Sequence, residues 1–292
     1  TGLFKSLSLE RVSKKGDALK IQVIDAPSDE RPADLAGYVL AELAGGRPEV
    51  EVSWCQGRRH IVTTAAQAIE EAGTASILPG SVWVVTGGAR GITASVAIAF
   101  GKKYGLRLHL IGRQPPGEVQ EAWRNMSPEQ WAQMKRSWLG GQRDQRKLAE
   151  WDSVCRAREI DNNLRRFADA GVHATYHACD LRDWDRLGVT LDRIRQADGP
   201  ITGVVHGAGT VGGFTRFASM RLEDIVQGVD TKATAAVALV CLTRHDPLRW
   251  FIGFASIAGR SGAVGRTDYT LASDLLCKLV GWCRTERPDC RA

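Results

Sequence analysis

The sequence predicts an α/β fold built on a doubly wound parallel sheet. From Ser81 onward, short runs of β-branched residues alternate with amphipathic stretches, and this order favours parallel strands joined by crossover helices. A glycine cluster follows the first of these strands and opens a helix, as in a nucleotide-binding βαβ unit. The 292 residues are 43% hydrophobic and 25% charged, which is typical of a globular chain and excludes global disorder.

The elements after Ser81 follow one another in a regular order. Strands are expected at Ser81–Thr86, Leu106–Ile111, Ala174–Cys179, Ile201–Val205 and Trp250–Phe254. Helices are expected at Ile92–Tyr104, Ile160–Ala170, Trp184–Ala197, Leu222–Leu242 and Tyr269–Arg284. The sequence stops where this rhythm calls for a sixth strand, so we expect one edge of the sheet to be missing.

Residues 1–80 predict a separate, smaller part of the chain. Its pieces are a helix end at Leu7 and Leu9, a strand at Ile21–Ile24, a helix at Leu35–Leu43 and a strand at Val50–Trp54. Together they make half of a second α/β unit, so we expect two domains, 1–80 and 81–292. Because the first residue is Thr1 and not Met, we expect the sequence to be a piece of a longer protein.

The segment 114–157 is longer than a usual loop between a strand and a helix, and it is rich in Trp, Gln and Arg. Within it, Ser-Pro-Glu-Gln at 127–130 predicts a helix start, with the serine as cap and the glutamine closing a capping box. Trp131, Met134 and Trp138 then fall on one helical face. We interpret the segment as an inserted helical hairpin that packs its tryptophans on the domain; a docking surface is the alternative.

Charge and cysteine usage limit the classes of function. The chain has 39 basic and 33 acidic residues, a net charge of +6, and its basic residues are scattered, which disfavours nucleic-acid binding. No apolar run approaches the roughly 20 residues that span a bilayer, so no membrane partner is expected. The seven cysteines include no CxxC pair and no zinc-like spacing with histidine, which predicts no metal site and a reducing compartment, the cytoplasm.

The strongest local motif is the glycine-rich stretch after the first strand. It reads Thr86-Gly87-Gly88-Ala89-Arg90-Gly91-Ile92. Glycine lets the backbone turn tightly and approach a phosphate, and the helix start offers free N–H groups and the positive end of the helix dipole. Its place in a βαβ series predicts a dinucleotide site, although tight turns also use glycine for purely steric reasons. Thr93 stands where such loops often have a further glycine.

Arg113 closes the second strand, where an NAD-binding unit usually places an acid for the ribose hydroxyl. Together with Arg90 in the glycine loop it predicts NADPH as the cofactor, because a guanidinium group binds the extra 2′-phosphate in a bidentate way. The alternative is an ordinary surface arginine at a strand end.

Two further strand ends supply candidate cofactor contacts. Asp180 and Leu181 end the third strand, where a carboxylate is placed to accept a hydrogen bond from the adenine amino group. Asp183, close by, is a candidate cap of the next helix. The fourth strand ends in His206-Gly207-Ala208-Gly209. Small residues at that edge let a flat cofactor lie against the backbone, at the crevice where doubly wound sheets bind ligands.

The candidate catalytic residues are Ser256, Tyr269 and Lys232. A tyrosine hydroxyl has an ordinary pKa of about 10, so it needs a nearby cation to exchange a proton near neutral pH, and a lysine supplies that charge. The serine hydroxyl would hold the substrate oxygen in place. Each residue also has an ordinary alternative: Ser256 as the cap of a turn, Tyr269 as a core residue, and Lys232 as a solvated helix residue.

These motifs, in this order, resemble the ketoreductase domains of modular or iterative polyketide synthases and of polyunsaturated-fatty-acid synthases, within the short-chain dehydrogenase/reductase superfamily. The glycine loop at 86–92, the turn at 206–209, and Phe254–Gly259 followed by Tyr269 are similar to motifs of that family. The resemblance spans nearly the whole chain. It implies a Rossmann-like sheet and, for residues 1–80, part of a truncated Rossmann-like structural subdomain that binds no cofactor.

The resemblance also implies an activity: NADPH-dependent reduction of a β-ketoacyl chain carried on an acyl carrier protein, inside a multidomain synthase whose other domains are partners. Tyr269 would donate the proton, Ser256 would position the oxygen and Lys232 would supply the positive charge, with Lys232 and Tyr269 also contacting the cofactor. The superfamily's common Tyr-x-x-x-Lys is absent. Lys232 is similar to the lysine that synthase ketoreductases carry on the preceding long helix.

The chain departs from the family pattern in ways that bear on function. Ser273 stands four positions after Tyr269, where the family usually has Asn, and it is a candidate catalytic residue. Neither the Leu-Asp-Asp motif nor the tryptophan that mark the two stereochemical classes is present, so the sequence does not specify the configuration of the product. The insertion at 114–157 is more like that of iterative fatty-acid-type or enediyne-type synthases.

Two alternative functions stay open at this point. One is a structural domain that keeps the fold and performs no reduction, which Ser273 favours. The other is a free-standing short-chain dehydrogenase, which the half-domain at 1–80 disfavours.

Overall fold

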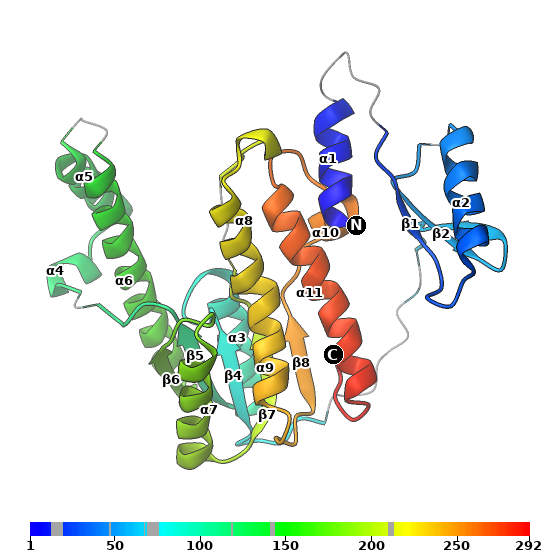
Figure 1. Ribbon diagram of the computed structural model, residues 1–292. Coiled ribbons are helices and arrows are strands. Elements are labelled where there is room, and N and C mark those ends of the chain that lie inside the picture. Colours follow the sequence, from blue (N-terminus) through cyan, green and yellow to red (C-terminus); the bar gives the residue numbers. More distant parts are fainter. Residues whose placement is uncertain are drawn as a thin grey trace. The chain divides into compact units, whose positions relative to one another are not determined.

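A parallel sheet forms the centre of one of the two compact units into which the chain divides (Figure 1). The computed structural model describes residues 1–12, 20–46, 48–66, 68, 76–117, 119–140, 144–209 and 213–292, without the side chain of Val12. Unit 1 comprises residues 1–75, 210–233 and 255–279; unit 2 comprises residues 76–209, 234–254 and 280–292. This grouping differs from a division at residue 80, so the two expected domains remain a prediction.

The sheet of unit 2 confirms the predicted fold class. Its strands are β4 (Val82–Thr86), β5 (Arg107–Gly112), β6 (Ala174–Ala178), β7 (Ile201–His206) and β8 (Trp250–Gly253). They are parallel and lie in the order β6-β5-β4-β7-β8, which is the doubly wound arrangement. All five residues of β4 are buried, because this central strand is covered on both faces. A single parallel bridge joins Trp250 to Arg291 beside β8.

Helices cover both faces of this sheet. They are α3 (Gly91–Tyr104), α6 (Gln145–Asp169), α7 (Trp184–Asp198) and α9 (Ala235–Leu242). In Figure 1, α7 and α9 lie side by side in front of the sheet, and α3 lies behind it. The core behind the sheet joins strand residues such as Leu108 and Leu110 to Ala97 of α3 and to Ile160 and Phe167 of α6. Helices α3 and α7 were predicted, and α9 was predicted as the end of a longer helix. Helix α6 begins fifteen residues earlier than the predicted start at Ile160.

Trp83 and Gly203 face each other across the two central strands, β4 and β7. A Cβ atom added to Gly203 would come within 2.2 Å of the Trp83 ring. The indole therefore fills the space that a side chain at position 203 would need, and this close approach requires glycine.

The insertion forms a helical hairpin, as predicted. It contains α4 (Glu121–Arg124), α5 (Pro128–Leu139) and the first half of α6. The capping box is present: the Ser127 hydroxyl accepts from the Gln130 N–H (3.3 Å), and the Gln130 side chain accepts from the Ser127 N–H (2.8 Å). Trp131 and Trp138 pack against Trp151, with ring centroids 4.9 and 6.0 Å away. The prediction that these tryptophans pack on the domain is therefore wrong: they stabilise the hairpin itself, because their partner Trp151 lies in the insertion's own part of α6.

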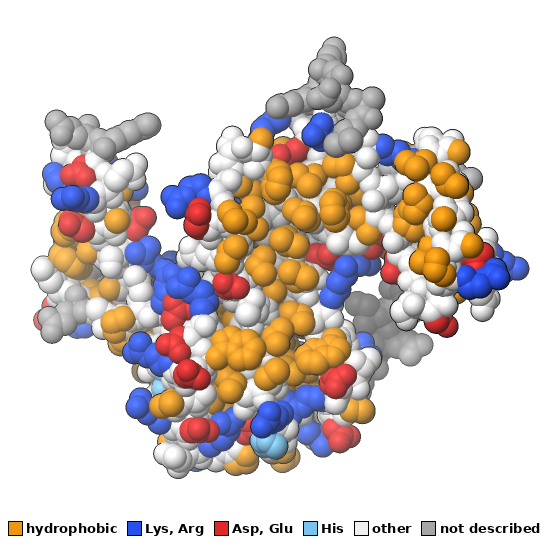
Figure 2. Space-filling model, viewed as in Figure 1, with side chains coloured by type: hydrophobic (Ala, Val, Ile, Leu, Met, Phe, Trp, Pro, Cys, Tyr) orange, Lys and Arg blue, Asp and Glu red, His pale blue; other side chains and the backbone are white. Residues whose placement is uncertain are grey.

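The surface of the insertion carries both signs of charge. Figure 2 shows basic and acidic side chains mixed on its visible face, at the left of the view. Asp161 pairs with Arg124 (3.2 Å) and with Arg165 (3.1 Å) along α6. On this visible face, the mixed charges give no single basic field of the kind that attracts a nucleic-acid backbone.

Unit 1 contains a small mixed sheet and several helices. The elements are α1 (Gly2–Val12), β1 (Val23–Asp25), α2 (Pro32–Ala44), β2 (Glu51–Cys55), β3 (Arg58–Ile61), α8 (Leu222–Val229), α10 (Ala258–Ser261) and the first part of α11 (Thr267–Glu286). Strand β3 was not predicted. It pairs antiparallel with β2 through a two-residue turn in which Gln56 (φ 51°) and Gly57 (φ 70°) both have positive φ, although glutamine is uncommon there.

Glu42 fastens α2 to this small sheet. Its buried carboxylate accepts hydrogen bonds from Arg59 (2.6 and 3.1 Å), from the Trp54 indole (2.9 Å) and from Gln22 (2.6 Å). The hydrogen bond from Arg59 is the largest effect that lowers the pKa of Glu42, which falls to about 2 against the opposing effect of burial. Nearby, the Tyr38 and Trp54 rings stack with centroids 4.7 Å apart.

The apolar stretch Leu222–Leu242, predicted as one helix, is three consecutive segments. α8 ends at Val229, the π-helical turn η2 spans Asp230–Thr234, and α9 follows. By length and composition alone this stretch reaches the size of a membrane span, contrary to the sequence expectation, and 44% of its most apolar window is buried. A core helix of a globular domain meets the same criterion.

Candidate active site

Strands β4 and β7 end side by side and are tied together by hydrogen bonds. The Thr86 hydroxyl lies 2.8 Å from Nδ1 of His206, and both side chains are fully buried. The Thr86 carbonyl accepts from the Gly207 N–H (3.1 Å), and the Thr86 hydroxyl accepts from the Ala208 N–H (3.4 Å). The glycine loop and the turn at 206–209 therefore meet at the carboxyl edge of the sheet.

Two glycines make this close approach possible. Gly87 has a φ of 68°, and a Cβ on it would lie 3.1 Å from the Ala208 backbone. A Cβ on Gly207 would lie 2.4 Å from the Thr93 hydroxyl. Thr93, the residue in place of a further glycine, is thus accommodated because Gly207 leaves room for it.

The start of α3 is held by a residue that the sequence did not single out. Arg90 precedes the helix in an extended conformation, and its own side chain does not cap it. Glu159 of α6 takes that place: its Oε1 accepts from the Gly91 N–H (2.9 Å) and its Oε2 from Arg90 Nε (2.7 Å). One turn later on α6, Asn163 donates to the Ala89 carbonyl (2.9 Å). Glu159 and Asn163 are four positions apart, so the sequence places them on the same face of α6. Nothing in the sequence, however, connects that face with the glycine loop.

The loops after β5 and β6 hold the other predicted cofactor residues. Arg113 is exposed just beyond β5. Asp180 pairs with Arg182 (2.6 Å), and hydrogen bonds from Arg182 lower the pKa of this carboxyl, with a smaller effect from Arg113. Leu181 is buried, and the Asp183 side chain accepts from the Arg186 N–H (3.0 Å), which confirms it as the cap of α7.

Lys232 and Tyr269 meet inside unit 1. Lys232 lies on the π-helical turn η2, and only 6% of its surface is exposed, so it is not a solvated helix residue. Its Nζ lies 5.2 Å from the centroid of the Tyr269 ring. Burial lowers the pKa of Lys232, and the nearby Tyr269 and Cys277 oppose that change. A π-helical turn inserted in a regular helix is a frequent feature of functional sites.

Tyr269 lies in the first turn of α11, close to the lysine and also to an arginine that the sequence did not single out. The guanidinium carbon of Arg266 lies 5.7 Å from the Tyr269 ring centroid and 4.3 Å from that of Phe214. Two cations therefore lie close to the tyrosine ring. Glu10 of α1 fixes the approach to this turn, since it accepts from the Gly265 N–H (3.0 Å) and the Thr267 hydroxyl (3.3 Å).

Ser256 and Ser273 belong to the segments next to Tyr269. The Ser256 hydroxyl accepts from the Ala258 N–H (3.2 Å), so the serine caps the turn that leads into α10, which is the ordinary alternative for this residue. A Cβ on Gly259 of α10 would lie 3.0 Å from the backbone of Ser273 on α11, so the two segments are in close contact. Ser273 is fully buried, and its hydroxyl has no hydrogen-bond partner among the residues that the structure describes.

The geometry thus resolves into two sets of residues, a dinucleotide-type loop in unit 2 and a lysine–tyrosine pair in unit 1. Comparison with known proteins decides between the possible families, because residues 81–288, well over half of the chain, match the family described as KR domain. The chain belongs to the KR domain family. Its members in polyketide synthases are oxidoreductases of the short-chain dehydrogenase/reductase type that reduce β-ketoacyl groups and bind NAD(P)H.

Relatives of this KR domain are large synthases. It is 28% identical over 249 residues to the polyketide synthase PksL of Bacillus subtilis (strain 168), covering 82% of this chain and 5% of that protein. It is 26% identical over 273 residues to a polyunsaturated fatty acid synthase protein of Thraustochytrium sp., covering 88% of this chain and 10% of that protein. The chain thus spans a tenth or less of the length of these relatives.

Solved structures show the same fold. A ketoreductase from the macrolactin assembly line superimposes with a TM-score of 0.69 at 17% identity, over 99% of this chain and 50% of that one. A ketoreductase domain from the bacillaene assembly line gives a TM-score of 0.69 at 19% identity, over 98% and 57%. A metagenomic short-chain oxidoreductase in complex with NADP gives 0.55 at 22% identity, over 73% and 80%. The resemblance inferred from the motifs is confirmed.

Proposed function

We propose that this KR domain uses NADPH to reduce the β-carbonyl of a β-ketoacyl thioester to a hydroxyl while the chain is attached to an acyl carrier protein. The single observation that supports this reaction best is the contact between the buried Lys232 and the Tyr269 ring, 5.2 Å from Nζ to the centroid. A cation held that close to a phenol is what proton donation by tyrosine near neutral pH requires.

The glycine loop fits a dinucleotide. Gly87 and Gly207 keep side chains out of the space where the two strand ends meet, and a Cβ at Gly91 would meet none of the described atoms within 4 Å. Thr86–Ile92 and His206–Gly209 would hold the cofactor, with Arg90 and Arg113 as the candidates for its 2′-phosphate and Asp180 and Leu181 for the adenine. When bound, the cofactor supplies the hydride.

The residues of unit 1 handle the substrate oxygen and its proton. Tyr269 would donate the proton to the oxygen as it becomes a hydroxyl, and the Lys232 ammonium would stabilise the phenolate left behind. Ser256 would hold the oxygen by a hydrogen bond, which requires its hydroxyl to leave the Ala258 N–H or to use its free proton. Ser273, one turn after Tyr269 with an unused hydroxyl, is the candidate for the place of the usual asparagine.

The relatives support a place in a larger synthase, and the free thiols support a reducing compartment. The chain matches only a small share of large synthases, so we infer that other synthase domains are its partners in a longer protein. All seven cysteines, each of them in the described ranges, are free thiols, which supports the cytoplasm as the compartment.

The test compares two tyrosine variants. Oxidation of NADPH is followed with a short β-ketoacyl thioester as the probe, in the wild type, in Tyr269→Phe and in the matched control Tyr104→Phe on α3. We expect Tyr269→Phe to lose at least about a hundredfold in turnover with NADPH binding retained, and the control to stay active. Undiminished turnover in Tyr269→Phe contradicts the assignment, and a wild type that binds NADPH without reduction favours the structural, inactive alternative.

A further inference from the structure

Glu159 places a carboxylate against the start of the nucleotide-binding helix. Its two oxygens bind two different groups, the backbone N–H of Gly91 (2.9 Å) and Nε of Arg90 (2.7 Å). The first N–H groups of a helix and an adjacent guanidinium are the donors that attract an anion in this fold. In this chain the anion is already present, and it comes from the protein's own helix α6.

The Gly91 N–H and Arg90 Nε cannot bind a second anion while they bind Glu159. The Gly91 N–H has one hydrogen to donate, and the Glu159 charge cancels the attraction of Arg90 for a phosphate placed beside it. A dinucleotide phosphate that uses the Gly91 N–H or Arg90 Nε must therefore displace the carboxylate, and one that binds the remaining N–H groups of Arg90 is repelled by the carboxylate beside it.

The contact is of a kind that a ligand can displace. Arg90 is 48% exposed and Glu159 37% exposed, so water screens the ion pair and its stabilisation is modest. Asn163, one turn further along α6, is 6% exposed, and its hydrogen bond to the Ala89 carbonyl (2.9 Å) does not involve the carboxylate. The loop therefore stays attached to α6 through Asn163 when Glu159 moves aside.

We propose that Glu159 is a cofactor-selecting residue, whose carboxylate occupies the position of a dinucleotide phosphate at Arg90 and Gly91 and weakens cofactor binding until it is displaced. This inference rests on the proposed function, since it concerns the same glycine loop. It adds a determinant of affinity contributed by helix α6, outside the β4–α3–β5 unit that carries the glycine loop.

The experiment measures dissociation constants of NADPH and NADH for the wild type, Glu159→Gln and Asp161→Asn by fluorescence titration. Glu159→Gln keeps the size of the side chain and removes its charge. Asp161→Asn is the matched control, because it removes a carboxylate from the same helix two residues away, where the partners are Arg124 and Arg165. We expect Glu159→Gln to bind NADPH about fivefold more tightly and the control to change by less than about twofold, with melting temperatures confirming that both variants are folded.

Comparing NADPH with NADH shows which phosphate of the cofactor displaces Glu159, because only NADPH carries the 2′-phosphate. A gain for NADPH that exceeds the gain for NADH supports displacement by the 2′-phosphate, and equal gains support displacement by the pyrophosphate that both cofactors share. Unchanged or weaker binding of both cofactors to folded Glu159→Gln overturns the inference and leaves the proposed function in place. If the wild type and the variant bind neither cofactor, the proposed function itself fails.

Discussion

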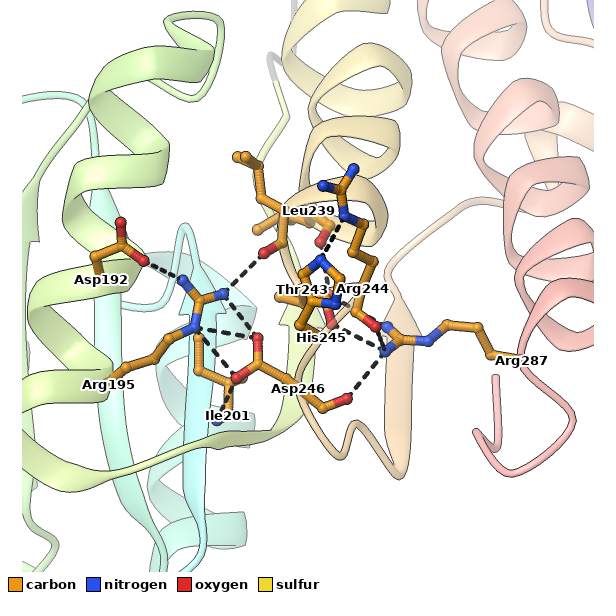
Figure 3. Close-up of polar contacts among 10 residues, drawn as sticks. Asp192, Arg195, Ile201, Leu239, Thr243, Arg244, His245, Asp246 and Arg287 are labelled. Atoms are coloured by element: carbon orange, nitrogen blue, oxygen red, sulfur yellow. Dashed lines mark hydrogen bonds and ion pairs between the residues drawn. The ribbon is translucent and has the colours of Figure 1, made fainter.

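Arg195 of α7 binds Asp246, the residue that fixes the start of β7 (Figure 3). Two guanidinium nitrogens lie 2.7–3.3 Å from the carboxylate, which is almost fully buried and also accepts the Ile201 N–H (3.0 Å). Arg195 further donates to the Leu242 carbonyl (2.8 Å) at the end of α9. The strand that carries His206 and Gly207 is thus anchored at its beginning by one ion pair.

Asp246→Ala tests this anchor. The substitution leaves a half-buried guanidinium and a buried N–H without their acceptor, so we expect a loss of about 2–3 kcal/mol in the free energy of unfolding. Denaturant titration measures it. Asp192→Ala is the control, because Asp192 pairs with the same arginine (2.6 Å) but is 64% exposed, and it should cost less than about 1 kcal/mol. Equal losses in the two variants would contradict the anchoring role.

Lys232→Met tests the lysine–tyrosine pair. Methionine keeps much of the volume of the buried stem and removes the charge, so we expect turnover to fall by about a hundredfold or more while NADPH still binds. The measurement is steady-state NADPH oxidation, with exposed Lys102→Met as the control. A Lys232→Met enzyme as active as the control would show that the ammonium has no part in proton donation.

The pH profile of the wild type gives a second view of Lys232. Burial lowers the pKa of this ammonium, so it loses its charge at a lower pH than an ordinary lysine. If the charged form supports catalysis, turnover must fall as the pH rises through that lowered pKa. We expect this alkaline limb in the wild type and expect it to disappear from the residual activity of Lys232→Met. The same alkaline limb in both proteins would assign it to another group.

The low pKa of Glu42 predicts that the stability of unit 1 falls in acid. Its folded-state pKa is about 2, below the ordinary value of 4.5, so its contribution to stability is complete above pH 4.5 and is lost as the pH falls toward 2. We expect Glu42→Gln to cost about 2 kcal/mol at pH 7 and progressively less below pH 4.5. Chemical denaturation at several pH values measures both quantities. A penalty that does not change with pH would mean that the charge of Glu42 is not what holds Arg59.

The lowered pKa of His109 predicts that the stability of unit 2 also depends on pH. It is buried, its Nδ1 lies 2.9 Å from His177, and its other ring nitrogen lies 3.1 Å from Asp198. Burial, followed by the neighbouring His177, lowers its pKa below 6.5, so its contribution to stability is present above pH 6.5 and is lost as the pH falls through the range below it. We expect the wild type to lose stability more steeply than His109→Gln as the pH falls below 6.5. The control, exposed His60→Gln, should follow the wild type.

Much of the fold could be predicted because its signals are local. The strands of unit 2 are apolar runs between glycine or aspartate turns, and the capping box at Ser127 marks the start of α5 at a single residue. Strand β3 was missed because its turn uses Gln56 at a positive φ, where the expected residues are asparagine, aspartate or glycine. The turn η2 was missed because a π-helical turn changes the hydrogen bonding of a helix without changing its apolar pattern.

The site was predictable to the extent that its residues lie in known motifs. Lys232 and Tyr269 were predicted as a pair, and the structure brings them into contact. Glu159 was missed because it acts through a tertiary contact with Gly91, 68 positions away in the sequence. Arg266 is only three positions before Tyr269, but its contact with Phe214 is tertiary, and nothing in the sequence connected either residue with the site.

The packing of Trp83 on Gly203 restricts the order in which these two residues can be substituted during evolution. Any side chain at position 203 collides with the indole, so that position can accept a substitution only after residue 83 has become smaller. The reverse order is open, because a smaller residue at 83 leaves only a cavity, which costs stability without a collision. The substitutions tolerated at position 203 therefore depend on which residue occupies position 83. A mutant library that varies one position at a time will find that only glycine is tolerated at 203.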